Sequence, residues 1–597
     1  MRTLLPKRVR ERIRRSQTVG PVLLAVSVGV FAALCAIVFR ELISAAQYLF
    51  FDLGAVIGSS APSGLVGDVV HGLHFLLAPA LGLVLVVWLV GRFAPEAKGH
   101  GVPEVQHAVR SGGGRMRPRV VLVKAVASAV TIGSGGSVGR EGPIVQVGSA
   151  VGSTIGQLLG LGKEELRLLV ASGAAAGIGA TFNAPIAGVV FALEVILGSF
   201  AARSFGLVVI SSVSATALSG AVLGREPAFR LTEAFTLVSE AELPLYAILG
   251  VGLGLAAVLY VRVLHTTESL FERWSISATG KAAVGGLLVG SLAFFGSSLL
   301  FGVGYEGIDM ALAGQLTLSV LAMLAVLKIV ATAVTLGAGG SGGVFAPALF
   351  IGAMFGGAYG EVVNLLMPSL TAPSGAYALV GMAGLFGSAA HAPMTAVLIL
   401  FEMTDNYQII LPLMLTVGLS YLIASRVHAE SVYSVKLRRL EGPKQADREG
   451  SVLDLLLVED ALVENVETVR PDMSVGSLAT FARSRRLRSW PVVDADDELV
   501  GIVTETDVEW GLVQGVGEVA TVVDIMTKNV VTLRPSDSLR TAFRVFGDRD
   551  VQLIPVVSED EGPHLVGALR RHEMIWAFKT ISEEHDRLLG SMAPAGT

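Results

Sequence analysis

Long stretches without a charged residue dominate the first two thirds of the chain. Uncharged runs occupy residues 21–39, 69–91 and 282–305, and residues 329–401 contain only one charged side chain, that of Glu361. Each run is long enough for at least one helix across a bilayer core of about 30 Å, which takes roughly 20 residues. The pattern predicts an all-α, polytopic membrane domain.

The pattern changes near residue 430, after which the chain becomes more charged and its apolar runs become short and alternating. The stretch "KLRRLEGPKQADREG" predicts a polar linker, which we place at residues 436–451. A repeated pattern follows in residues 452–513 and 522–581: a strand ending in Arg-Pro, a helix, two strands ("WPVVD" and "LVGIV", or "IPVVS" and "LVGAL") and a helix. The repeat predicts two small α/β domains.

The apolar part also repeats, more faintly. "GSGGSVGREGP" at 133–143 corresponds to "GAGGSGGVFAP" at 337–347, and "FNAPIAGVVFALE" at 182–194 corresponds to "AHAPMTAVLILFE" at 390–402. Glycine-interrupted apolar segments at matching places in two halves are typical of transporters built from internal, often inverted, repeats.

Composition and charge agree with a membrane protein. The chain is 52% hydrophobic and 16% charged, which is too apolar for a soluble domain of this length. Residues 1–18 carry seven Lys or Arg against one Glu, and the positive-inside rule places this segment in the cytosol. The apolar run that follows is too long for a cleavable signal. Cys35 is the single cysteine, so an intramolecular disulfide is excluded.

Three glycine-rich breaks indicate an anion site: "KGHGVPEV", "GREGPIV" and "GGVFAPAL". Each reads as a loop leading into a helix with proline in its first turn, so exposed N–H groups and the positive end of the helix dipole face the break. One helix end contributes roughly 0.3 to 2 kcal/mol to a nearby anion, whereas dehydrating an ion costs at least several kcal/mol. Several ends must therefore converge. The alternative for any single motif is close helix packing by glycine.

Four of these motifs together resemble the CLC family of chloride channels and proton-coupled chloride antiporters: "GHGVP" (99–103), "GREGP" (139–143), "FNAPIAG" (182–188) and "GVFAP" (343–347). The resemblance covers about residues 15–440, and the repeat after it resembles a tandem pair of CBS domains. It implies a CLC-like domain at 19–435, all-α with inverted repeats and many broken and tilted helices. It also implies a cytosolic α/β CBS pair (452–513 and 522–581) and a short tail (582–597).

The resemblance assigns a gating role to Glu141, whose carboxylate would mimic chloride at an anion site and leave it on protonation or displacement. A salt bridge between Glu141 and its chain neighbour is the alternative, although adjacent residues rarely face each other at a helix start. The expected anion-binding positions are His100, Gly139, Arg140, Gly142, Val344, Phe345 and Tyr433. Tyr433 alone could equally be an interfacial anchor.

Two positions depart from the family pattern. His100 stands where a serine usually faces the central anion, and a surface histidine is the alternative reading. If His100 lines the pore, its titration should alter anion occupancy. Val195 stands where proton-coupled members commonly place an internal acid, which favours the channel branch. Glu194 beside it is expected to be structural.

The CBS pair has one nucleotide-like signature. In "GIVTETD", Thr504 and Asp507 occupy the positions that hold an adenosine ribose in the CBS family, while the second copy has Arg570 and Glu573 there. The resemblance therefore implies a possible adenine nucleotide at the first copy, with a purely structural pair as the alternative.

The sequence thus predicts a homodimeric, chloride-selective, passive channel of the cell membrane, with voltage gating as an option within the family and regulation by its cytosolic CBS domains. A proton/chloride antiporter of the same family is the alternative, and a CBS-regulated magnesium transporter or a membrane-tethered nucleotide sensor is more distant. A nucleic-acid partner is not expected. We find no metal-ligand cluster and no G-x-S-x-G nucleophile motif, so an enzyme is not expected either.

Overall fold

The computed structural model divides the chain into two compact units, Met1–Leu440 and Glu441–Thr597. It describes residues 19–52, 65–229, 231, 235–441, 456–483, 488–513, 519–549, 551–558, 562–574 and 576–577. The predicted basic segment 1–18, most of the predicted linker and the predicted tail 582–597 lie outside the described residues.

The first half of unit 1 consists of helices joined by loops. Its principal helices are α2 (Val19–Gln47), α4 (Leu65–Phe93), α5 (Val102–Arg110), α6 (Arg119–Gly133), α7 (Glu141–Leu159), α8 (Lys163–Phe182), α9 (Pro185–Phe191), which continues as the π-helix η3 (Ala192–Leu197), and α10 (Ala202–Leu223).

The second half repeats this order. It consists of α11 (Leu243–Arg273), α12 (Ala278–Phe295), α13 (Tyr305–Leu312), α14 (Leu318–Gly337), α15 (Phe345–Leu366), α16 (Ser374–Ala390), α17 (Pro393–Thr404), α18 (Ile410–Val427) and α19 (Ser434–Glu441). Among the described residues, eight helices are long and apolar enough to cross a membrane. The prediction of a multispan all-α domain is confirmed.

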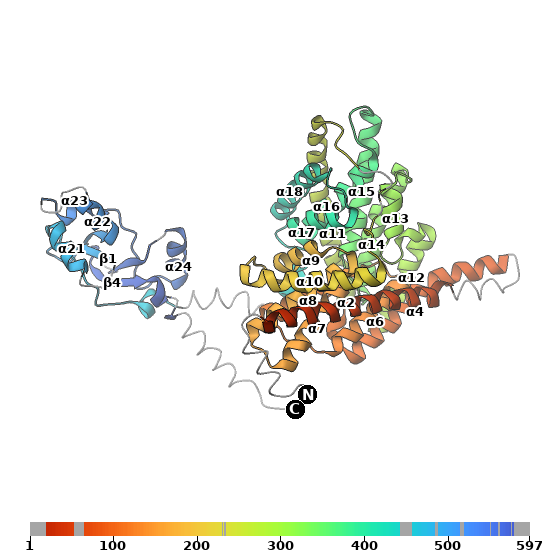
Figure 1. Ribbon diagram of the computed structural model, residues 1–597, viewed down its shortest axis with the longest axis horizontal. Coiled ribbons are helices and arrows are strands. Elements are labelled where there is room, and N and C mark those ends of the chain that lie inside the picture. Colours follow the sequence, from red (N-terminus) through yellow and green to blue (C-terminus); the bar gives the residue numbers. More distant parts are fainter. Residues whose placement is uncertain are drawn as a thin grey trace. The chain divides into compact units, whose positions relative to one another are not determined.

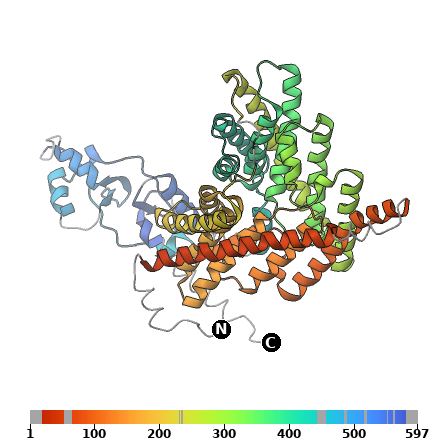
Figure 2. The same ribbon diagram turned by 45° about the vertical axis from the view of Figure 1, so that its right-hand side comes forward.

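Helix packing follows the same plan in both halves (Figures 1 and 2). Helices α7 and α8 pack together as α15 and α16 do, and α2 contacts α8 and α10 as α11 contacts α16 and α18. Figure 2 shows α2, in red, running the length of its half of the unit. The sequence repeat is therefore a repeat of packing as well.

Paired glycines allow the closest of these helix crossings. A Cβ at Gly148 would lie 2.2 Å from the carbonyl oxygen of Gly173, and one at Gly352 would lie 2.3 Å from that of Gly381. These are equivalent α7–α8 and α15–α16 contacts in the two halves. The glycines inside these helices therefore serve close helix packing.

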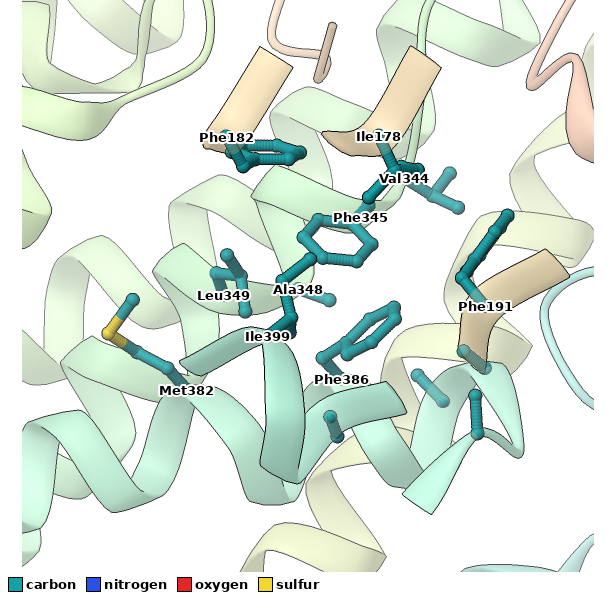
Figure 3. Close-up of a cluster of buried hydrophobic side chains, with 14 of the residues drawn as sticks. Ile178, Phe182, Phe191, Val344, Phe345, Ala348, Leu349, Met382, Phe386 and Ile399 are labelled. Carbon is teal, nitrogen blue, oxygen red and sulfur yellow. The ribbon is translucent and has the colours of Figure 1, made fainter. Parts of the chain in front are cut away.

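An aromatic cluster joins the two halves at the start of α15 (Figure 3). The ring of Phe345 lies between those of Phe182, from α8, and Phe386, from α16, at centroid distances of 5.8 and 4.0 Å. All three side chains are at most 2% exposed. The cluster fixes the N-terminus of α15 against both halves.

Unit 2 contains the two predicted α/β repeats. Strand β1 (Ser489–Val493) pairs antiparallel with β2 (Leu499–Thr504), and β3 (Leu553–Val557) pairs antiparallel with β4 (Leu565–Arg570). Helices α21 (Val475–Arg483), α22 (Glu505–Val513), α23 (Val522–Ile525) and α24 (Leu539–Asp548) accompany them.

The predicted strand before each Arg-Pro is shorter than expected. It is an isolated parallel bridge, Val469 to Val492 in the first copy and Leu533 to Val556 in the second. The proline two residues later has no N–H to donate, so the pairing cannot continue past it.

Candidate functional site

Three glycine-rich loops meet at one junction within unit 1. Gly139 and Gly343 exchange two backbone hydrogen bonds, each 2.7 Å long. Gly99 joins them, because its N–H donates to Gly340 and its carbonyl oxygen accepts from Gly342. Segments that are about 200 to 240 residues apart in sequence are thereby hydrogen-bonded together. The predicted convergence of the three breaks is confirmed.

Three helices begin at this junction: α5 after Gly101, α7 after Arg140 and α15 after Val344. The first N–H groups of each helix have no partner within the helix, and the positive ends of three dipoles come together. Gly142 is needed for this approach, because a Cβ there would lie 2.1 Å from the carbonyl oxygen of His100. The arrangement suits a negative charge.

A carboxylate occupies the junction. Glu141, the first residue of α7, is 1% exposed. Its Oε2 accepts from the backbone N–H of Ala346 at 3.3 Å, and its Oε1 accepts from the hydroxyl of Tyr305 at 3.0 Å. Glu141 of one half is thus bound at the helix start of the other half. The alternative of a simple salt bridge with its neighbour does not describe these contacts.

Arg140 is the chain neighbour of Glu141 and carries a positive charge, but its guanidinium is directed at two aromatic rings. Its guanidinium lies over the rings of Phe182 and Tyr305, at 5.6 and 5.0 Å from their centroids. It also lines a cavity with Arg40 and Tyr305. Tyr305 was not predicted from the sequence, since a tyrosine after a glycine is too common a pattern to single out.

The other predicted anion positions lie close to the same junction. Val344 is the N-cap residue of α15, and its carbonyl oxygen accepts from the hydroxyl of Tyr260 at 3.2 Å. Tyr433 precedes α19 and is 2% exposed, so it is not a lipid-interface anchor in this unit. The N–H of Val432 holds this segment to the carbonyl oxygen of Ala389 at 2.8 Å. Tyr433 interacts electrostatically with Glu141 and Tyr260.

His100 is fully buried, so the reading of it as a surface histidine is wrong. Its Nε2 lies 3.1 Å from Oε1 of Glu268, and Nδ1 of His265 lies 3.2 Å from Oε2 of the same carboxylate. Both partners come from the last turns of α11. The i, i+3 spacing of His265 and Glu268 was visible in the sequence, but no rule linked that pair to His100, 165 residues earlier.

The position of the usual internal acid is apolar and enclosed. Val195 lies in η3, is 6% exposed, and its carbonyl oxygen accepts from Nε2 of Gln106 at 2.8 Å. Glu194 beside it accepts from the backbone N–H groups of Met394 and Thr395 at the start of α17.

The repeat mate of Glu194 makes the reciprocal contact. Glu402 in α17 accepts from the N–H groups of Ile186 and Ala187 at the start of α9, at 2.9 and 2.7 Å. Each glutamate therefore caps a helix of the other half. The structural role expected for Glu194 agrees with this geometry.

In unit 2, Thr504 and Asp507 contact each other. The hydroxyl and the N–H of Thr504 donate to Oδ2 of Asp507 at 2.7 and 2.8 Å, at the start of α22. Thr504 also lines a cavity of about 470 Å³ between the two repeats, together with Arg488, Arg549 and Pro555. In the second copy, Nη1 of Arg570 lies 3.9 Å from Oε1 of Glu573.

Family models match both units. A model described as "Voltage gated chloride channel" matches residues 82–425, and the CBS domain model matches residues 458–509 and 522–579.

The sequence is also similar to the sequences of known proteins. The chain is 34% identical over 419 residues to a putative chloride channel protein, ClcB-like, of Ralstonia nicotianae, over 69% of this chain and 95% of that one. It is 32% identical over 419 residues to the H(+)/Cl(-) exchange transporter ClcA of Vibrio campbellii, over 65% of this chain and 88% of that one.

The chain is also similar to solved structures. That of a slow cyanobacterial Cl-/H+ antiporter has a TM-score of 0.64 and 27% identity, and covers 70% of this chain and 97% of its own. That of a eukaryotic CLC transporter, at 20% identity, shows the fold alone, with a TM-score of 0.61 over 95% of this chain and 98% of that one.

Proposed function

The chain belongs to the voltage-gated chloride channel family and carries two CBS domains, and from this premise we propose that it exchanges chloride for protons across a membrane. Several similar proteins are named as H(+)/Cl(-) exchange transporters, and a similar structure is titled as a Cl-/H+ antiporter. Exchange is the alternative of the sequence-based prediction, and these names favour it over a passive channel.

The observation that carries the proposal is the position of the Glu141 carboxylate. It is held by the N–H of Ala346 and the hydroxyl of Tyr305 where the positive ends of α7 and α15 meet. Donors that hold a carboxylate also suit a chloride ion, since both are anions that accept hydrogen bonds. We infer that the two compete for this place.

Competition of this kind provides coupling. While Glu141 is ionised it fills the anion position, and chloride must displace it. When Glu141 takes up a proton it loses its charge and its hold on the N–H donors, so chloride can enter. The same carboxylate then responds to both ions, because chloride displaces it and a proton neutralises it. A proton is carried each time the carboxylate alternates between the two sides of the membrane. Gly139, Gly142, Val344 and Phe345 supply the surrounding backbone, and Tyr433 interacts electrostatically with Glu141.

A passive channel remains the second candidate, because one observation favours it. Val195 offers no proton-binding group at the position where proton-coupled members commonly have an acid. Chloride passage gated by Glu141 without net proton movement would then result. The difference between the two candidates is measurable.

Flux from liposomes tests the proposal. Vesicles loaded with high KCl are diluted into low chloride with valinomycin present, and external chloride and external pH are followed together. An exchanger alkalinises the external medium while chloride leaves, because protons enter. Glu141→Gln keeps the size and hydrogen-bonding capacity of the side chain but cannot release a proton. We expect this variant to move chloride without protons. Chloride efflux from the wild-type protein with no pH change would reject exchange.

We further propose that the protein is a homodimer in the cell membrane, with residues 1–18 and the CBS pair in the cytosol. We also propose that the CBS pair binds an adenine nucleotide. The cavity beside Thr504, whose hydroxyl contacts Asp507, supports the nucleotide. Calorimetric titration of the full-length protein with ATP, ADP and AMP tests it, with Asp507→Ala as the variant that should weaken binding.

A further inference from the structure

The proposed exchange requires a second proton-binding group, since protons must reach Glu141 from the side opposite to their release. Val195 cannot provide it, and Glu194 beside it is engaged at the start of α17. The group must lie elsewhere in unit 1. This inference rests on the proposed function.

A buried carboxylate with two histidines lies at the C-terminal end of α11. Glu268 accepts from His100 at Oε1 and from His265 at Oε2, at 3.1 and 3.2 Å. The side chains of Glu268, His100 and His265 are 12%, 0% and 9% exposed. Because His100 lies between Gly99 and Gly101, the cluster is attached directly to the junction of the three loops.

The outer nitrogens of both imidazoles have no hydrogen-bond partner among the described residues. These are Nδ1 of His100 and Nε2 of His265, and both atoms are buried. When each neutral ring donates its inner N–H to Glu268, each outer nitrogen is left as a proton acceptor. The cluster then has one negative charge in all, so uptake of one proton neutralises it.

A cavity lies beside the cluster and is lined in part by residues of α19. His265 lines this cavity of about 380 Å³ with Thr266, Ser269 and Val435. Its charged or titratable lining residues are Arg262, Arg273, His428, Glu430 and Arg439. On the other side of the cluster, His100 interacts electrostatically with Lys436, which also pairs with Glu104 at 2.6 Å. Glu104 in turn interacts with Lys124. The surrounding charge is thus mostly positive, which helps to hold one carboxylate ionised.

Electrostatic interactions through two buried tyrosines connect this cluster with Glu141. Tyr260, in α11 two turns before Glu268, interacts electrostatically with Glu268 and with Tyr433. Tyr433 interacts electrostatically with Glu141. The hydroxyl groups therefore mark a direction from the cluster toward the gating carboxylate.

We propose that Glu268, flanked by His100 and His265, is the inner proton-binding site of this exchanger and takes the place of the acid missing at Val195. A hydronium ion in the cavity gives a proton to Nε2 of His265 and becomes water, and Nδ1 of His265 then gives its proton to Oε2 of Glu268. His265 is again neutral and Glu268 is a neutral acid. No other group changes its charge in this step.

Liposome flux with paired chloride and pH readouts tests the proposal. Glu268→Gln keeps the shape of the cluster but cannot bind the proton. A positioned group accelerates proton transfer by roughly 100-fold or more, so we expect proton flux to fall by about that factor while chloride flux continues. Glu268→Asp should restore proton flux in part. Glu272→Gln is the matched control: it removes a carboxylate four residues later on α11, 61% exposed and paired with Arg439, and should leave coupling unchanged.

The outcomes separate this inference from the proposed function. A wild-type protein that moves no protons rejects exchange and the inner site together. A coupled wild-type protein whose Glu268→Gln variant is equally coupled overturns the inner site alone. If Glu268→Gln is not monodisperse on size exclusion, His265→Asn decides, because Asn keeps a donor to Glu268 and removes the outer acceptor. Unchanged proton flux in His265→Asn would then overturn the inference.

Discussion

Replacing Tyr305 by Phe should make chloride bind more tightly. The variant removes the hydroxyl that donates to Oε1 of Glu141 at 3.0 Å and leaves the ring, over which Arg140 lies, in place. Loss of a hydrogen bond to a charged group costs about 1.5 to 3 kcal/mol. The ionised carboxylate is weakened by that amount as a competitor for the anion position.

The expected size of the effect follows from this competition. Each 1.4 kcal/mol is about tenfold in an equilibrium constant, so the apparent dissociation constant for chloride should fall by up to about 10- to 100-fold. Isothermal titration of the purified protein with chloride, at a fixed pH at which Glu141 is ionised, measures it. The half-saturating chloride concentration for liposome flux should fall in parallel.

A double-mutant cycle decides whether the hydroxyl acts through the carboxylate. In a Glu141→Ala background there is no competitor, so Tyr305→Phe should change chloride affinity little. An equal change in both backgrounds would mean that the hydroxyl acts on the anion or on the fold. An unchanged affinity of Tyr305→Phe in the wild-type background would refute the competition itself.

Three further predictions concern stability and ion flux. Gly142→Ala should abolish flux and lower the melting temperature, because its Cβ would overlap a backbone oxygen. Gly418→Ala, whose Cβ would have nothing within 4 Å, should do neither. Liposome flux and fluorescence-detected thermal melting measure the two effects for both variants. Glu194→Gln and Glu402→Gln should each lower the melting temperature by weakening a cap and leave the ratio of protons to chloride unchanged, and an altered ratio would contradict their structural role. Thr504→Ala should destabilise unit 2 by about 1 kcal/mol through loss of a helix-start contact, as measured by urea unfolding followed by tryptophan fluorescence.

The repeated glycine motifs were enough to predict the junction at the centre of unit 1. Glycine at bilayer depth is tolerated only where exposed backbone meets protein or a cavity, and proline in the first turn marks a helix start. These local rules located the beginnings of α7 and α15. The pairing of Gly139 with Gly343 follows from their equivalence in the two halves.

The partners of the site could not be predicted in the same way. Tyr305 reaches Glu141 across 164 residues, and Glu268 reaches His100 across 168. Such contacts depend on how α11 and α13 pack, which no local spacing encodes. The sequence did show that His100 was unusual, yet only the fold reveals that its ring is buried against a carboxylate. In unit 2 the predicted strand before each Arg-Pro is only an isolated bridge, at Val469 in the first copy and at Leu533 in the second.

The reversal potential of the wild-type protein in a planar bilayer tests the central claim most directly. Chloride and proton gradients are set independently, and the voltage of zero current is measured as each is varied. Exchange predicts that the reversal potential shifts when the pH gradient alone is changed, and that it lies away from the chloride equilibrium potential. A reversal potential that stays at the chloride equilibrium potential at every pH gradient would contradict exchange and establish a passive chloride pathway.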